Sequence, residues 1–430
     1  MLKEFERIIG YESIKEELEL ICDVVRNYDK YEQLGVSYPG GILLEGNPGV
    51  GKTLLAKCFI EATGLKSFVC RKNKPNGAFV DEIKRIFDEA EKSAPSIVLL
   101  DDMDKFANED LDHKDAEEYV TIQSCIDNVK DKKVLVIATI NDRYKIPDSL
   151  KRAGRFDKKI YMYMPKGEDA EKIVKHYLSK MPVSEELDVT DVANLLDGSS
   201  CAVLETVIKK AGMYAGFSNK TSIEMEDIVK AFLDVKYHIN NSDKRITKRT
   251  KYSSVHEAGH AVMIEALFPD TVNLVILNNH KDSHNLGGAI SRVAELGDIE
   301  PFQDEIYDLM ISLSGKAAVE LKFGNIDVGC YSDMQRAYRV AEIIIDDMCG
   351  FGFDTHTGSY GGTAVIDRKD YMIAKLIETY YKKVQKIIVD NQELLNCVAN
   401  ELLEKKVLLR KDIKKIKEQV HVDRSGVHLI

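Results

Sequence analysis

The chain has 430 residues and a formal net charge of −11, with 44% hydrophobic and 30% charged residues. This length suggests two or three domains with buried cores, and the composition is typical of a globular protein. The negative charge disfavours a nucleic-acid partner or an anionic membrane surface. No apolar run approaches the roughly 18 residues of a transmembrane helix, so we expect no membrane segment in this chain.

The 8 cysteines are scattered along the chain without a C-x-x-C pair. A chain of this length has other sources of stability, so a reducing compartment fits it better than a disulfide-forming one. The N-terminal sequence, MLKEFERIIGYE, lacks the apolar core of a signal peptide. We therefore expect a cytoplasmic protein.

The first part of the chain alternates between helical stretches and apolar, strand-like runs. Apolar spacing predicts helices at 12–34, 52–63 and 79–92. Strands are expected at 40–45, 67–70, 96–102, 133–141 and 158–164. Strands that are separated by helices indicate a parallel sheet with helices on both faces.

The rest of the chain is mostly helical. Four short helices are expected first, at 168–179, 189–196, 201–215 and 224–234. After a polar, basic stretch, longer helices are expected at 252–267, 302–323, 332–349 and, in pieces, 369–419, with one hairpin near 271–293. We therefore predict an α/β subdomain, a helical lid, a linker and a mostly helical second domain, at 1–165, 166–238, 239–251 and 252–430.

The segment GNPGVGKT matches the phosphate-loop pattern G-x-x-x-x-G-K-[ST] and lies between a predicted strand and a predicted helix. Glycines in such a loop let backbone N–H groups surround the phosphates. Lys52 would bring positive charge to the β and γ oxygens, and the Thr53 hydroxyl would hold Mg²⁺. We expect the nucleotide, ATP, to contact Asn47, Pro48, Gly49, Val50, Gly51, Lys52, Thr53 and Leu54.

Polar residues at the ends of two later strands complete this pattern. Asp101 would hold the Mg²⁺ shell, and Asp102 would orient or deprotonate the attacking water. Asn141 ends the neighbouring strand and could contact the γ-phosphate. Arg152 and Arg155 in KRAGRFD could stabilise charge on a transferring phosphoryl group, although this stretch alone is compatible with a basic turn. The order of these elements, followed by a helical lid, resembles a AAA ATPase module.

The segment VHEAGHAV contains the H-E-x-x-H pattern. On a helix, positions i and i+4 share a face, so His256 and His260 can offer two imidazole nitrogens to one zinc ion. Glu257 lies beside that face and could act as general base in the attack of zinc-bound water on a peptide bond. A catalytic zinc also needs a third protein ligand, and spacing alone does not choose among Asp304, Glu320, Asp327, Asp333 and Asp346.

The order of motifs, a AAA module followed by HEAGHA, LSGKAAVELKFG and GCYSDMQRAYRVAEIII, resembles the FtsH family of ATP-dependent zinc metalloproteases. The resemblance extends from about residue 5 to 420. It implies that Asp333 is the third zinc ligand and that Ile9 and Gly10 lie near the adenine. It also implies that Arg152 and Arg155 are arginine fingers that act across a subunit boundary. Family members are hexameric rings that feed unfolded polypeptides to a protease chamber.

Three departures from the family pattern stand out. The family has membrane helices before the ATPase module, and this chain has none. It has Glu where this chain has Asp102, and a carboxylate misplaced by about 1 Å can lower a rate about a hundredfold, so we expect slow ATP hydrolysis. The stretch RKNKPNG at 71–77 lacks the aromatic residue with which the family's pore loop grips substrates, so we expect weak unfolding.

We therefore predict an ATP-dependent zinc endopeptidase that degrades proteins, uses Zn²⁺, ATP and Mg²⁺, and assembles as a homo-hexamer. The predicted edge strand LGGAISRV could pair with the substrate backbone, as in many zinc peptidases. Two alternatives remain open at this point. One is a zinc peptidase whose ATPase is weak or serves only gating, and the other is a nucleotide-binding scaffold with little proteolysis.

Overall fold

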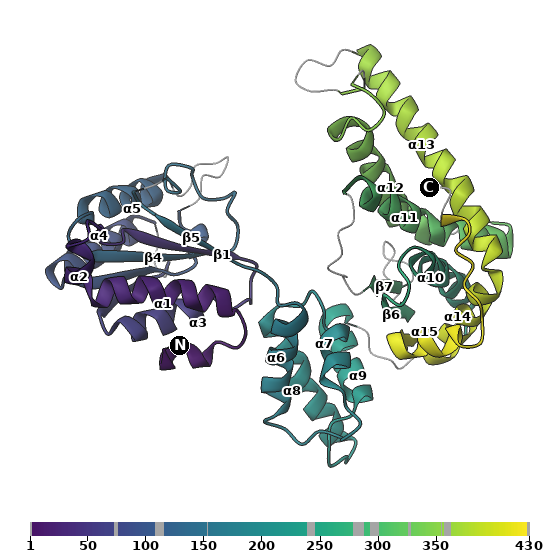
Figure 1. Ribbon diagram of the computed structural model, residues 1–430, viewed down its shortest axis with the longest axis horizontal. Helices are drawn as coiled ribbons and strands as arrows, with labels where there is room; N and C mark the ends of the chain where they lie inside the picture. Colours follow the sequence, from purple (N-terminus) through teal and green to yellow (C-terminus); the bar gives the residue numbers. More distant parts are fainter. Residues whose placement is uncertain are drawn as a thin grey trace. The chain divides into compact units, whose positions relative to one another are not determined.

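The chain folds into two compact units, Met1–Tyr237 and His238–Ile430 (Figure 1). No helix in the part of the chain that the structure describes combines the length and apolar character needed to cross a bilayer. The computed structural model describes residues 2–72, 76–107, 116–152, 154–238, 246–277, 288–292, 301–325, 328–353, 355–356 and 363–427. The predicted pore loop and linker therefore fall partly outside the described residues.

The first unit is built on a five-stranded sheet in the order β2-β3-β4-β1-β5, in which every neighbouring pair is parallel. The strands are β1 (Gly41–Gly46), β2 (Lys66–Cys70), β3 (Ser96–Leu100), β4 (Val134–Ile140) and β5 (Lys158–Met162). Figure 1 shows α1 and α3 on one face and α4 and α5 on the other. These helices are α1 (Glu12–Arg26), α3 (Lys52–Thr63), α4 (Asn76–Lys92) and α5 (Ala116–Val129). The predicted parallel α/β sheet is confirmed.

Burial explains why these runs form the centre of the sheet. Every residue of β1, β3 and β4 is buried, as expected for parallel strands covered on both faces. The edge strands β2 and β5 are partly exposed. The helix expected at 12–34 is interrupted at Asn27, after which the short helix α2 (Tyr28–Glu32) begins. Helix α5 was not anticipated from the sequence.

Four helices complete the first unit: α6 (Gly167–Leu178), α7 (Val189–Leu195), α8 (Cys201–Phe217) and α9 (Met225–Tyr237). Short polar side chains begin two of them. The Asp188 carboxylate accepts the Thr190 N–H (2.8 Å) before α7, and Ser200 Oγ accepts the Val203 N–H (3.4 Å) before α8. Such caps satisfy N–H groups that have no partner inside the helix.

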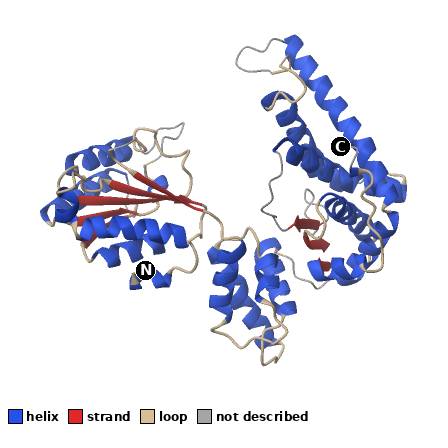
Figure 2. Cartoon of the chain, viewed as in Figure 1, coloured by secondary structure: helices blue, strands red, loops and turns tan. Residues whose placement is uncertain are grey.

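The second unit is mostly helical, as predicted, with one small sheet (Figure 2). Its helices are α10 (Lys248–Leu267), α11 (Pro301–Phe323), α12 (Tyr331–Glu342), α13 (Thr363–Asp390), α14 (Gln392–Lys405) and α15 (Arg410–Lys417). Its antiparallel strands, in the order β7-β6-β8, are β6 (Val272–Leu277), β7 (Gly288–Arg292) and β8 (Val407–Leu409). The helices expected in pieces within 369–419 correspond to α13, α14 and α15, whereas the short strand β8 between α14 and α15, which pairs with β6, was not expected.

Helix α10 is the centre of the second unit. Every residue from Ser253 to Leu267 is buried, so its whole circumference is covered by other elements. At Gly259 it meets α11 so closely that a Cβ there would lie 2.6 Å from Ala318 Cβ and 2.7 Å from the Ser314 carbonyl oxygen. Only glycine permits this approach, and the approach fixes α10 against α11.

We expect Gly259→Ala to lower the free energy of unfolding by about 1–3 kcal/mol, because the added methyl group overlaps backbone atoms of α11 that have no room to move. Gly216→Ala on α8 is the matched control, since no atom lies within 4 Å of the position its Cβ would take. The control should leave stability unchanged or raise it slightly. Calorimetric unfolding of both variants provides the comparison, and an unchanged melting temperature for Gly259→Ala would contradict the close packing described here.

Candidate functional sites

Three metal-ligating side chains converge in the second unit. His256 and His260 lie one turn apart on α10, and Asp333 lies in the first turn of α12. Asp333 Oδ2 is 2.8 Å from His256 Nε2 and 3.4 Å from His260 Nε2, and the two Nε2 atoms are 3.1 Å apart. Among the described residues, these three form the one group of His, Cys, Asp or Glu side chains close enough to share a metal ion.

The surroundings of this triad fit a metal ion. His260 Nδ1 lies 2.8 Å from the Ile311 carbonyl oxygen and 3.0 Å from Ser314 Oγ. A carbonyl oxygen only accepts, so Nδ1 carries the proton and Nε2 presents its lone pair to the triad. A Cβ at Gly315 would lie 2.6–2.7 Å from the two imidazole rings, so this glycine keeps the space beside them open. Two imidazole nitrogens and a carboxylate oxygen that converge at this spacing form a donor set that fits a metal ion.

Burial and charge act in opposite directions at this site. Burial alone would raise the pKa of Asp333, but its contacts with the two histidines hold it well below the usual range. Burial would likewise lower the pKa of His260, but Asp333 raises it. Glu257 is buried beside them, and burial raises the pKa of its carboxyl group. The site therefore pairs one strongly anionic carboxylate with another that binds a proton more readily.

The other carboxylates that spacing left open have different surroundings. Glu320 accepts hydrogen bonds from Lys316 and from the Tyr381 hydroxyl. Asp346 lies 3.0 Å from His356 and 3.4 Å from Lys369. Asp304 lies in the first turn of α11, and Asp327 falls outside the described residues. Of the described candidates, only Asp333 joins the two histidines.

The phosphate loop connects β1 to α3 at the carboxyl edge of the sheet. Lys52 Nζ donates to the Gly46 and Asn47 carbonyl oxygens (2.7 and 2.9 Å) and to Asn141 Oδ1 (2.8 Å). Thr53 Oγ1 donates to Asp101 Oδ1 (2.8 Å). Burial lowers the pKa of Lys52, although the nearby aspartates partly offset this effect. The predicted lysine, threonine, aspartate and asparagine are thus brought together from three elements.

Asp102 has an unusual setting that the sequence did not reveal. Its backbone is left-handed (φ 55°), and its N–H donates to Thr139 Oγ1 (2.8 Å). Its carboxylate lies 2.7 Å from Lys105 Nζ and 3.4 Å from an Arg71 nitrogen. Burial would raise the pKa of Asp102, but these two cations lower it. The ion pair between Asp102 and Lys105 could have been predicted, because the two residues are three apart in the sequence. The contact with Arg71 could not, because Arg71 is distant in the sequence.

The N-terminal segment and the helical lid contact the same region. Tyr11, next to Gly10, donates its N–H to Asp169 Oδ1 of α6 (3.0 Å). The Ala202 N–H of α8 donates to the Gly49 carbonyl oxygen (3.1 Å), and Cys201 Sγ lies 3.4 Å from the Val50 carbonyl oxygen. The structure therefore brings the start of the chain and the phosphate loop to the same lid. Ile9 directly precedes Gly10, and Pro48, Gly51 and Leu54 lie within or just after the loop.

The two predicted fingers differ in their contacts. Arg155 forms a bidentate pair with Asp127 (2.8 and 2.7 Å) and also donates to the Ser149 carbonyl oxygen. The Asp127 contact raises the pKa of the Arg155 guanidinium. The Arg152 side chain is exposed. Of the two arginines, Arg155 is thus the one that an ion pair among the described residues holds in place.

Comparisons with known proteins agree with this fold. Residues 42–164 match the ATPase family associated with various cellular activities (AAA), and residues 243–416 match peptidase family M41. The fold and sites thus define an AAA ATPase joined to an M41 peptidase domain. This order of an AAA module and an M41 peptidase region agrees with the resemblance to the FtsH family that the motifs indicated.

Relatives along nearly the whole chain are FtsH proteins. "ATP-dependent zinc metalloprotease FtsH" of Aster yellows witches'-broom phytoplasma is 29% identical over 96% of this chain and 63% of its own length. The protein of the same name from Caldicellulosiruptor bescii is 27% identical over 96% of this chain and 71% of its own. "ATP-dependent zinc metalloprotease FtsH 2" of Thermoanaerobacter sp. is 26% identical, with 96% and 83% covered. The chain thus spans slightly less than two thirds of the first of these relatives.

Ser314 was not singled out in the sequence, and its contact with His260 generates a prediction. We expect Ser314→Ala to weaken zinc binding about 10- to 100-fold, because groups that orient a histidine ligand contribute this much to metal affinity. Ser312→Ala is the matched control, since Ser312 is equally buried on α11 but donates only to the Asp308 carbonyl oxygen (2.9 Å). Competition with a chromophoric chelator measures both affinities. Equal affinities for the two variants would show that Ser314 does not orient His260.

Proposed function

We propose that this chain is an ATP-dependent zinc endopeptidase that degrades protein substrates. The observation that carries the proposal is the convergence of His256, His260 and Asp333 beside Glu257, in a chain that also has a complete phosphate loop. The names of its relatives, ATP-dependent zinc metalloproteases, agree with it. The assignment keeps the α/β subdomain, lid, linker and peptidase domain at the boundaries expected from the sequence.

The triad would hold the zinc ion through two imidazole nitrogens and one carboxylate oxygen, a ligand set that catalytic zinc sites use. Bound zinc would lower the pKa of a water molecule towards about 7 and polarise the substrate carbonyl. The Glu257 carboxylate accepts the proton of the attacking water and delivers it to the amine nitrogen that leaves. Buried α10 holds Glu257 and both histidines on one rigid element.

Strand β7 would align the substrate. Within the described part of the second unit, β6 pairs with β7 on one side and with β8 on the other, which leaves one side of β7 without a strand partner. An extended peptide can add to such an edge through its own backbone N–H and C=O groups. Backbone pairing of this kind would bind many sequences, which suits an enzyme that degrades proteins.

The first unit would bind ATP with Mg²⁺. Lys52 would exchange its carbonyl contacts for phosphate oxygens, and Thr53 and Asp101 would hold the Mg²⁺ shell. In a homo-hexamer, Arg152 and Arg155 would face the nucleotide of the neighbouring subunit. We place this assembly in the cytoplasm, without a nucleic-acid partner, because all eight cysteines are free and the net charge is −11.

Glu257→Gln tests the peptidase assignment. We expect casein cleavage in the presence of ATP to fall at least about 100-fold, because a general base contributes about 10²–10⁴ to such a rate. Zinc content and ATP hydrolysis should not change, since the introduced amide neither ligates the metal nor approaches the phosphate loop. Cleavage is compared with ATP, with a non-hydrolysable analogue and without nucleotide. Undiminished cleavage by Glu257→Gln would refute the assigned role, and cleavage independent of nucleotide would refute the ATP dependence.

A second pair of substitutions tests the ATPase. The side chain of Asp102 is one methylene shorter than that of glutamate, and its carboxylate forms ion pairs with Lys105 and Arg71. We therefore expect slow ATP hydrolysis and predict that Asp102→Glu combined with Lys105→Ala raises turnover about tenfold or more, because the longer, released carboxylate can reach the attacking water. Steady-state phosphate release measures turnover, with Lys52→Ala as the background control. Fast hydrolysis by the unchanged chain, or no gain in the double variant, would contradict this account of Asp102.

A further inference from the structure

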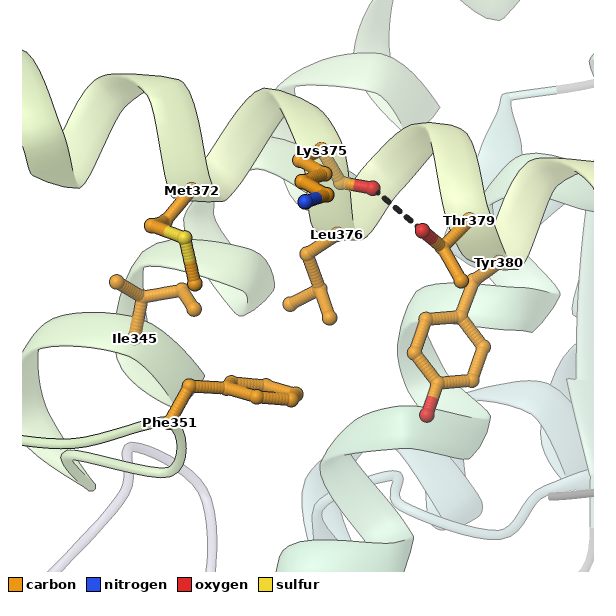
Figure 3. Close-up of a pocket in the computed structure, with 7 residues that line it drawn as sticks. All are labelled: Ile345, Phe351, Met372, Lys375, Leu376, Thr379 and Tyr380. Atoms are coloured by element: carbon orange, nitrogen blue, oxygen red, sulfur yellow. Dashed lines mark hydrogen bonds between the residues drawn. The ribbon is translucent and has the colours of Figure 1, made fainter.

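A cavity of about 280 Å³ lies in the second unit, between α13 and the π-helical turn Ile343–Asp347 that continues α12 (Figure 3). Figure 3 shows Met372 and Leu376 pointing from α13 towards Ile345 and Phe351, with the Tyr380 ring at the other end of the cavity. None of these residues belongs to the metal site or to the nucleotide site. The cavity is therefore a separate feature whose apolar walls need an explanation.

The size of the cavity limits what it can hold. A buried apolar cavity of about 150 Å³ accommodates a benzene molecule, and pockets for drug-sized ligands begin at about 300 Å³. The observed volume lies between these values, so it suits one large apolar side chain. Phe351 is 48% exposed at the rim, and Phe353, 88% exposed, lies two residues further on. Apolar side chains exposed around an apolar cavity are typical of a surface that binds polypeptide.

The charge at the mouth selects among such occupants. Lys375 is the one charged residue that lines the cavity. Its side chain is exposed, and none of the ion pairs among the described residues involves it; its ammonium group lies 5.9 Å from the centre of the Tyr371 ring. An unpaired ammonium group beside apolar walls favours a carboxylate next to the bound side chain. The complementary occupant is thus a large apolar residue adjacent to aspartate or glutamate.

The cavity is connected to the metal site by one continuous helical segment. Asp333 and Ile345 are twelve residues apart along α12 and the turn that continues it. At 1.5 Å per residue this separation is about 18 Å. An extended peptide covers that distance in about five or six residues. A substrate chain long enough to be degraded therefore has the reach to contact both places.

We propose that this cavity is an accessory binding site for protein substrates, which takes a large apolar side chain and pairs the adjacent acidic residue with Lys375. The inference rests on the proposed peptidase function, because only a bound polypeptide gives it a role. It adds a preference that the metal site alone does not supply. Unfolded segments that contain apolar residues next to acids are retained longer than segments that contain neither.

Peptide binding to Glu257→Gln protein tests the proposal. Three fluorescein-labelled peptides share a Gly-Ser frame and carry Leu-Phe-Asp, Leu-Phe-Lys or Gly-Ser-Asp at its centre, and fluorescence anisotropy gives their dissociation constants. We expect Leu-Phe-Asp to bind about fivefold more tightly than Leu-Phe-Lys, the size of one exposed charge pair. Phe351→Ala should weaken both Leu-Phe peptides about fivefold. Lys375→Glu should reverse the order of Asp and Lys.

Lys382→Glu is the matched control, because Lys382 lies on the same helix, is 71% exposed and does not line the cavity. It should preserve the preference for Leu-Phe-Asp. Equal affinities for all three peptides, or an unchanged preference in Lys375→Glu, would overturn the proposal. A change in sedimentation coefficient caused by Lys375→Glu, without a change in peptide affinity, would also overturn it and assign the cavity to contact between copies of the chain.

The same peptides separate this inference from the proposed function. Peptide preferences that respond to Phe351→Ala and Lys375→Glu, in a protein that leaves casein intact, would support the accessory site and refute the peptidase. Casein cleavage without any peptide preference would support the peptidase and refute the accessory site. In the active enzyme, both substitutions should raise the KM for casein and leave kcat unchanged, because neither residue belongs to the group of His256, His260 and Asp333 or to Glu257 beside it.

Discussion

The contact between α10 and α11 determines where two of the proposed metal ligands, His256 and His260, lie. At Gly259 the backbones approach so closely that no side chain fits, and at Gly315 the same closeness leaves space only for the two imidazole rings. The Ile311 carbonyl oxygen and Ser314 hydroxyl of α11 then orient His260 from the side opposite Asp333. A metal site that tolerates displacements of only a few tenths of an ångström thus depends on two glycines that ligate nothing.

Much of this arrangement could be predicted because its signals are local. The spacing of His256 and His260 specifies a shared helix face, and the phosphate loop specifies a strand before it and a helix after it. The partner carboxylate could not be chosen by spacing, because which of several acids approaches α10 depends on how α12 packs. Similarly, β8 is a strand only because it pairs with β6, which is distant in sequence. Long-range packing, rather than the local sequence pattern, determines both the third residue of the triad and the strand β8.

The setting of Asp102 shows a different limit of sequence reasoning. Its shorter side chain was visible in the sequence, but its ion pair with Arg71 was not, because Arg71 follows a different strand. A carboxylate held between two cations is a weaker proton acceptor and is less free to turn towards a phosphate. Both effects would slow ATP hydrolysis, as would the side chain of Asp102, which is one methylene shorter than the glutamate of the family pattern. The short side chain and the two cations would therefore both slow the ATP hydrolysis proposed for this module.

If ATP hydrolysis is slow, as we propose, the peptidase would need more than its cleavage site to retain a substrate. If cycles of ATP hydrolysis are infrequent, a polypeptide bound only at the cleavage site can dissociate between two cycles. A second contact about 18 Å away keeps the chain attached and raises the effective concentration of the next peptide bond to the millimolar range that short tethers provide. The apolar cavity would supply such a contact, since Ile345 in its wall lies on the helical segment that carries Asp333 and Lys375 lies opposite on α13. Retention of substrate at the proposed accessory site would thereby compensate for the weak delivery that we expect of the ATPase.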